Sequence, residues 1–230
     1  MKICVFSDIH GNGFSFRPAF QEILNSRANL NVFLGDLCGY YYDQMEIFEM
    51  LMNIPNLIAI RGNHDQMFLD IMRGDQKLRR NYIQKFGLSM ENLLSQRHKP
   101  LSDWLESLPL SFEDEEKKYA CFHGSPKNPL EGYVYPDSPV DCFDNLPASY
   151  CFLGHTHHKM NIDIGKKIIN PGSLGQPRDY GWPTFALVSV SSGEVKYEEV
   201  VFDINGLSMQ IKKNGDSRSY FEKISKRWTQ

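Results

Sequence analysis

The chain of 230 residues contains little cysteine and has no CxxC pair. Its five cysteines are Cys4, Cys38, Cys121, Cys142 and Cys151. An odd number without a close pair argues against a disulfide framework and against a cysteine zinc site. Three of these residues lie inside apolar runs, where a reduced thiol packs like a small hydrophobic group. We therefore expect reduced, structural cysteines, as in a cytoplasmic protein.

The sequence also has no long apolar run and no large excess of charge of either sign. None of its apolar runs approaches the length of a membrane span, and the N-terminal segment reaches Asp8 too soon for a signal peptide. Lysine and arginine number 25 against 28 acidic residues, a formal net charge of -3. Such a chain cannot bind nucleic acid by bulk electrostatic attraction. We expect a cytoplasmic protein that interacts with neither membranes nor nucleic acid in bulk.

Short apolar segments of strand length recur along the chain. They span 2–8, 31–36, 56–63, 119–124, 149–155, 166–173, 184–190 and 194–202. Helical patterns at 15–26 and 44–53 separate the first three, which is the order of a layered α/β fold with a largely parallel sheet. The last two segments flank a short turn and read as an antiparallel hairpin. This mixture of strand types favours two packed sheets with helices outside over one open sheet.

The segment 66–108 lacks a strand pattern and is helical in character. We expect a helical insertion or cap whose charged runs are solvated helix faces; alternatively, the cap lends a cation to an anionic substrate. The stretch 108–122 reads as a hairpin, and the polar tail from about residue 206 reads as weakly helical with a break at 214–215. Since no Pro/Gly/Ser-rich linker divides the chain, we expect a single domain over residues 1–230.

Five of the apolar segments end in a histidine, aspartate or asparagine. These residues are Asp8, His10, Asp36, Asn63, His123, His155 and His157. Ligands in layered α/β folds gather outside the carboxyl ends of the strands, and five such endings are hard to attribute to turn chemistry alone. Seven mixed oxygen and nitrogen donors suit two divalent ions that share a bridging carboxylate. If the chain stays extended beyond each strand, His155 and His157 point the same way, as do Asp8 and His10, while His158 points away.

The residues form an ordered set of motifs: DxH at 8–10, GD at 35–36, GNHD at 62–65, HG at 123–124 and GHTH at 154–157. In this order they resemble the calcineurin-like metallophosphoesterases, from residue 8 to residue 177. The stretches SDIHGN, GDLCGY and NPGSLGQPRD are similar to a branch of small, single-domain bacterial and archaeal members. The resemblance implies a four-layer αββα sandwich, in which two mixed sheets are flanked by helices.

The resemblance also implies a role for each motif residue. It assigns Asp8, His10 and His157 to one metal ion, Asn63, His123 and His155 to a second, and Asp36 to both. It makes His64 the residue that stabilises or protonates the leaving oxygen, with Asp65 orienting its ring. The implied reaction is hydrolysis of a phosphate ester by a metal-bound hydroxide. The nitrogen and oxygen ligands suit Mn, Fe, Zn, Co or Ni without choosing among them, and Mn²⁺ is favoured for assays.

Several alternatives stay open at the level of sequence. The substrate is expected to be a small phosphorylated molecule; a phosphodiester or nucleotide-like substrate is favoured, but the same centre suits a phosphomonoesterase or a protein phosphatase. A non-catalytic, protein-binding scaffold of the same fold is an alternative of another class. Arg178 either binds substrate phosphate or pairs with Asp179. Asn12 is a candidate substrate contact, and the GYYYD stretch at 39–43, which departs from the family pattern, either lines a pocket or packs.

Overall fold

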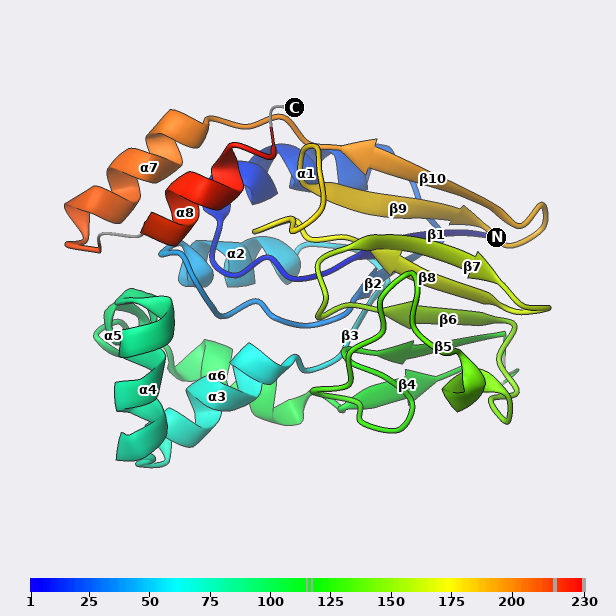
Figure 1. Cartoon of the computed structure of the whole chain (residues 1–230), viewed down its shortest axis with the longest axis horizontal. Coiled ribbons are helices and arrows are strands. Elements are labelled where there is room, and N and C mark those ends of the chain that lie inside the picture. The colour runs from blue at the N-terminus through cyan, green and yellow to red at the C-terminus, as the bar shows by residue number, and fades with distance from the viewer. Residues whose placement is uncertain (115, 117, 217–218, 229–230) are drawn as a thin grey trace.

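The computed structural model describes residues 1–114, 116, 118–216 and 219–228, and in it two mixed five-stranded sheets are flanked by helices (Figure 1). The first sheet has the strand order β10-β9-β1-β2-β3. Its strands are β1 (Lys2–Phe6), β2 (Leu30–Phe33), β3 (Leu57–Ala59), β9 (Thr184–Ser189) and β10 (Glu194–Glu199). Strands β1, β2 and β3 run parallel, whereas β9 is antiparallel to both of its neighbours. The predicted hairpin of β9 and β10 is confirmed.

The second sheet has the strand order β4-β5-β6-β8-β7. Its strands are β4 (Ser111–Glu113), β5 (Tyr119–Phe122), β6 (Tyr150–Leu153), β7 (Lys159–Asp163) and β8 (Lys167–Pro171). Strands β5, β6 and β8 are parallel, and β4 and β7 pair antiparallel at the two edges. The sequence did not predict β7, because this edge strand of sequence KMNID buries only Met160 fully and has no apolar run.

Helices occupy the segments that carry the helical pattern. They are α1 (Gly13–Asn25), α2 (Gln44–Leu51), α3 (Asn63–Met72), α4 (Gln76–Phe86), α5 (Ser89–Leu94), α6 (Lys99–Ser107), the 3-10 helix η1 (Asp141–Phe143), α7 (Ile204–Lys213) and α8 (Ser219–Ser225). Helix α7 ends at the predicted break. None of the described helices is both long and apolar enough to traverse a lipid bilayer.

Alternation along the strands divides the core into layers. Val5 and Val32 point between the sheets and pack with residues of the second sheet such as Phe152. Phe6 points to the opposite face of the first sheet, where α1 and other helices cover it. On the outer face of the second sheet, Phe143 of η1 packs with residues of β5 and β6. Each fully buried side chain of this size contributes about 1.5–3 kcal/mol to folding. The predicted sandwich is therefore confirmed, with a thinner cover over the second sheet.

The parallel strands of both sheets end on the same side of the molecule. In Figure 1, β1, β2, β5 and β6 all run toward the end at which α3–α6 and α7–α8 lie. The loops that follow these strands are therefore neighbours in space although they are distant in sequence. Ser173, in the loop after β8, donates from its hydroxyl to the carbonyl of Asp8 at 2.7 Å, and the N–H of Gly154 donates to the carbonyl of His123 at 2.9 Å. The first bond joins loops of the two sheets, and the second joins two loops of the second sheet.

Candidate metal centre

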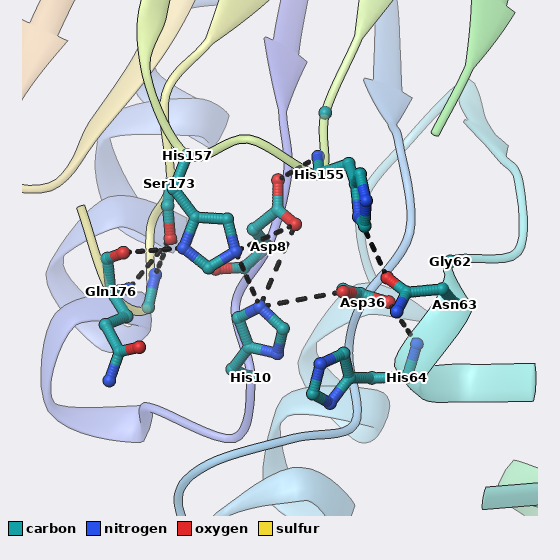
Figure 2. Close-up of polar contacts among 12 residues, drawn as sticks. Asp8, His10, Asp36, Gly62, Asn63, His64, His155, His157, Ser173 and Gln176 are labelled. Atoms are coloured by element: carbon teal, nitrogen blue, oxygen red, sulfur yellow. Dashed lines mark hydrogen bonds and ion pairs between the residues drawn. The ribbon is translucent and has the colours of Figure 1, made fainter. Parts of the chain in front are cut away.

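The seven predicted ligands lie in the loops after β1, β2, β5 and β6 and at the first residue of α3. Figure 2 labels all of them except His123. Five of them have left-handed backbone: Asp8 (φ 54°), His10 (φ 50°), Asp36 (φ 61°), His155 (φ 66°) and His157 (φ 60°). The expectation that an extended chain aligns each pair is therefore wrong; left-handed turns direct these side chains inward. Such backbone costs about 1–3 kcal/mol per residue and is concentrated at functional sites.

The rings of His10 and His157 face each other beside Asp8 (Figure 2). The Nδ1–H of His10 donates to the carbonyl of Cys38 at 3.0 Å, and that of His157 donates to the carbonyl of Gln176 at 2.6 Å. Because a carbonyl only accepts, the Nε2 atoms of the neutral rings carry no hydrogen. These two Nε2 atoms are 3.0 Å apart, and Asp8 Oδ1 lies 3.8 and 3.4 Å from them. Facing lone pairs repel each other unless a cation binds both.

A second group of donors surrounds the side-chain oxygen of Asn63. His123 places its Nε2 3.0 Å from Asn63 Oδ1, and its Nδ1–H donates to the carbonyl of Leu34 at 2.8 Å. His155 Nδ1 lies 3.1 Å from the same oxygen. Among the described residues, His155 Nε2 has no hydrogen-bond partner. The structure thus brings together the three residues that the motifs assign to one ion.

Asp36 lies between the two groups. Its Oδ2 is 3.6 Å from His10 Nε2 and 3.4 Å from His123 Nε2, while its Oδ1 accepts from the backbone N–H of His64 at 2.8 Å. Residue 62 has to be glycine because a Cβ there would overlap Asp36 Oδ1. The position of this carboxylate is the one that a bridging ligand needs.

The centre combines buried negative charge with histidine rings, most of which are neutral. Asp8 and Asp36 are 0% and 1% exposed. Burial alone would raise both carboxyl pKa values, but neighbouring histidines, chiefly His157 and His123 respectively, hold each below its ordinary range. Burial lowers the pKa of His155 to about 4 and so keeps this ring neutral. For His123, burial would lower the pKa, but Asp36, Asp8 and the carbonyl of Leu34 together raise it to about 9. The carboxylates therefore favour positive charge at the centre.

These residues fit a divalent metal ion. Three groups of the described residues could hold one: Asp8, His10 and His157; Asp8, Asp36 and His123; and His10, Asp36 and His64. Within the described part of the chain, Asp8 Oδ1 is buried without a hydrogen-bond partner. A buried carboxylate needs a cation or donors to compensate its lost hydration. Imidazole and carboxylate donors without sulfur suit first-row divalent ions.

The prediction that Asp65 orients the ring of His64 is wrong. The Nδ1 of His64 is instead 2.9 Å from the hydroxyl of Tyr82, in α4. The Asp65 carboxylate accepts three backbone hydrogen bonds, from the N–H groups of Gly62, Asp36 and Cys38 at 3.0, 2.8 and 2.9 Å. Because Asp65 is the third residue of α3, its side chain reaches back to the helix N-terminus. It therefore holds the loop after β2 against α3.

Asn12, the other candidate substrate contact, does not line the pocket described below. Its Oδ1 accepts from the N–H of Ser15 at 3.2 Å, which caps α1, and its Nδ2 donates to the carbonyl of Gly175 at 2.9 Å. The residue is fully buried. An asparagine at a helix N-terminus commonly makes this first bond, so the sequence signal that placed Asn12 near the site reflects capping.

Arg178 lies at the pocket, whereas His158 lies outside the metal centre. A guanidinium nitrogen of Arg178 donates to the hydroxyl of Tyr40 at 3.2 Å, and Arg178 lines the pocket described below. Asp179 contacts Lys159 instead, as acceptor from its backbone N–H at 2.9 Å. His158 Nδ1 contacts the carbonyl of its near neighbour Thr156 at 2.7 Å, outside all three donor groups. This placement is consistent with two inward-facing histidines and one outside.

A pocket of about 840 Å³ opens in front of the centre. Asp36, Asn63, His64, His155 and His157 line its floor. Its walls include Tyr40 together with residues that the sequence interpretation missed, among them residues 83–87 at the end of α4, Tyr133, Gln176 and Asp216. Tyr133 is 58% exposed, and its ring lies 4.3 Å from that of His155. The GYYYD stretch was the one available signal, and Tyr40 does line the pocket.

Comparison with known proteins places this geometry in context. A model of the calcineurin-like phosphoesterase superfamily domain matches residues 1–193. The chain is 29% identical to an uncharacterized protein of Methanocaldococcus jannaschii, with 92% of each chain aligned. The crystal structure of a metallophosphoesterase from Sphaerobacter thermophilus superposes with a TM-score of 0.79 at 25% identity, covering 99% of both chains. A hypothetical protein from Pyrococcus horikoshii superposes with a TM-score of 0.77 at 21% identity, covering 97% of both.

Proposed function

The chain belongs to the calcineurin-like phosphoesterase superfamily, and we propose that it hydrolyses a small phosphate ester with two divalent metal ions. One observation carries the proposal. The Nε2 atoms of His10 and His157, both without hydrogen, meet at 3.0 Å beside the buried carboxylate of Asp8. Hydrogen bonding does not stabilise this arrangement, whereas metal coordination does.

The residues that would hold the ions divide between the two donor groups. Asp8, His10 and His157 would hold the first ion, Asn63, His123 and His155 the second, and Asp36 both. Bound there, divalent ions would neutralise charge on the phosphoryl oxygens and lower the pKa of water. The backbone carbonyls behind His10, His123 and His157 fix each ring with Nε2 toward the centre.

The remaining polar groups of the pocket act on the substrate. His64 lies at the pocket floor and donates a hydrogen bond to the departing ester oxygen, which stabilises the charge that develops there. The guanidinium of Arg178 binds a phosphoryl oxygen, for which its planar donors are suited. Tyr40 holds Arg178 through the 3.2 Å bond to its hydroxyl. The chain therefore supplies a donor for the leaving group and a cation for the phosphate.

We favour a phosphodiester or nucleotide-like substrate over a phosphoprotein or a simple monoester. The pocket volume of about 840 Å³ is far larger than a phosphate group needs, and it falls in the range of small-molecule sites. Phe86 and Tyr133 offer apolar surface for a group attached to the phosphate. The five cysteines are free, which supports the cytoplasm as the compartment.

Hydrolysis of chromogenic esters tests the function. The protein is loaded with Mn²⁺, its metal content is measured, and it is assayed with bis(p-nitrophenyl) phosphate and with p-nitrophenyl phosphate. Faster turnover of the diester supports our preference, and Asp36→Asn is the inactive control. A panel of nucleotides then identifies the natural substrate class. A protein that binds metal but turns over neither ester with Mn, Fe, Zn, Co or Ni would be a scaffold, and the proposal would be wrong.

A further inference from the structure

Tyr82 contacts His64 but belongs to none of the sequence motifs. It is the fully buried residue of α4, with 1% exposure, and its hydroxyl lies 2.9 Å from His64 Nδ1. The other ring nitrogen, Nε2, lies 3.5 Å from the hydroxyl of Tyr40, a residue that lines the pocket. The ring of His64 therefore has one nitrogen bonded to the helix and the other toward the pocket wall.

Aromatic packing fixes this orientation. The His64 ring centroid lies 4.9 Å from that of Phe86, 5.0 Å from that of Tyr40 and 5.6 Å from that of Tyr82. These rings meet His64 at steep angles of 60°, 71° and 79°. A ring surrounded in this way cannot rotate without displacing its neighbours. The helix α4 thus contributes both the bond and part of the packing.

The partner of Nδ1 distinguishes His64 from three metal-ligand candidates. His10, His123 and His157 each direct Nδ1 at a backbone carbonyl, which requires a hydrogen on Nδ1 and, in the neutral ring, leaves Nε2 without a hydrogen that a metal ion would have to replace. A tyrosine hydroxyl, unlike a carbonyl, can donate. When Tyr82 donates to Nδ1 of the neutral ring, the ring hydrogen is on Nε2. This is the tautomer that donates a hydrogen bond into the pocket.

We propose that Tyr82 is a positioning residue for the phosphoesterase reaction: it donates to His64 Nδ1, keeps the hydrogen on Nε2 and aims it at the leaving oxygen. The inference rests on the proposed function. It also gives the segment 66–108 a role in catalysis, because α4 carries the hydroxyl that bonds His64 Nδ1 and no motif residue makes that bond. A neutral hydroxyl here takes the place predicted for the Asp65 carboxylate, which holds backbone N–H groups instead.

Nitrogen NMR of the metal-free protein tests the tautomer without any turnover. Spectra of protein labelled with ¹⁵N in histidine report which nitrogen carries the hydrogen, and His64→Gln identifies the His64 signals. We expect the Nε2–H form in the wild type and its loss in Tyr82→Phe. Tyr150→Phe is the matched control, because the Tyr150 hydroxyl bonds the carbonyl of Val190 at 3.2 Å, with no histidine involved. An Nδ1–H tautomer in the wild type would overturn the proposal.

Leaving-group dependence tests the consequence for catalysis. The substrates are methyl aryl phosphates whose leaving groups range from p-nitrophenol to the more basic phenol. We expect Tyr82→Phe to lower kcat about 10- to 100-fold for the phenol ester, less for the nitrophenol ester, with KM and metal content unchanged. In the His64→Gln background, Tyr82→Phe should add nothing. An equal loss for all leaving groups, or an additive double variant, would make Tyr82 merely structural. Absence of turnover in the wild type would refute the proposed function, while the NMR result would still decide the tautomer.

Discussion

The floor and the wall of the pocket are built in different ways. In the metal centre, which forms the floor and the layer beneath it, the rings of His10, His123 and His157 are bonded to backbone carbonyls in the loops that follow the strands. Around the wall, side chains bond other side chains: Arg178 bonds Tyr40, and Tyr82 of α4 bonds His64 at the edge of the floor. The geometry of the floor therefore depends on where each strand ends, and short sequence motifs mark those positions. The wall depends on how later segments pack.

The C-terminal tail belongs to the wall. The Asp216 carboxylate accepts from the hydroxyl of Tyr42 at 2.8 Å and from the N–H of Leu88 at 3.1 Å. One side chain after α7 thus joins the loop that contains Tyr40 to the segment between α4 and α5. The indole N–H of Trp228 donates to the carbonyl of Pro177 at 3.1 Å, next to Arg178. Floor and wall can therefore be perturbed separately, and four predictions test that separation.

The largest expected effect is on the floor. Asp36→Asn removes the charge between the two donor groups and should lower activity at least about 1000-fold, because charge stabilisation of several kcal/mol is lost. Metal content should fall in parallel, as mass spectrometry can measure. Asp103→Asn is the matched control, since Asp103 is exposed and pairs with Lys99 on the surface of α6. Full activity of Asp36→Asn would refute the role of the floor.

The three histidines of the GHTH segment should behave as two classes. His155→Ala and His157→Ala should each weaken metal binding at least about 100-fold, because each removes a donor that lies in the centre. His158→Ala should leave metal binding unchanged, since this ring bonds the carbonyl of Thr156. Isothermal titration calorimetry with Mn²⁺ measures the metal affinity of all three variants. Equal losses would show that the division between the histidines is wrong.

A change on the wall should affect the substrate and spare the metal. Arg178→Lys keeps the positive charge but loses the planar pair of donors, so KM should rise about 10-fold. Metal content should match that of the wild type. The reverse pattern, a loss of metal with unchanged KM, would mean that Arg178 supports metal binding and that the wall is not separable from the floor. Steady-state kinetics and metal analysis on the same preparation separate the two cases.

The smallest effect concerns a residue beneath the floor. Asn12→Ala removes the cap of α1 and should destabilise folding by about 1 kcal/mol. Because Asn12 bonds Ser15 and Gly175 and does not line the pocket, kcat at saturating metal should be unchanged. Chemical denaturation and kinetics measure the two quantities. A fall in kcat with unchanged stability would restore Asn12 as a substrate contact.

Sequence patterns predicted the sheets and the members of the floor because apolar runs and strand-end residues are local signals. The strand β7 was missed because an edge strand needs few apolar residues. Asp65 was assigned to the wrong partner because its position in GNHD carries no information on which N–H groups surround it. Tyr82 was missed for a stronger reason: it looks like any apolar residue of an amphipathic helix. Its contact with His64 depends on tertiary packing alone.

The left-handed backbone of the floor has a consequence for mutational scanning. Aspartate, asparagine and histidine adopt this conformation more readily than other residues with a side chain. An alanine at Asp8, Asp36 or His155 would remove a ligand and also strain the turn, so the measured loss would combine two effects. Asparagine at either carboxylate position removes the charge while keeping the backbone preference. An alanine scan would therefore overstate the contribution of these ligands, whereas Asp8→Asn and Asp36→Asn would measure the charge itself.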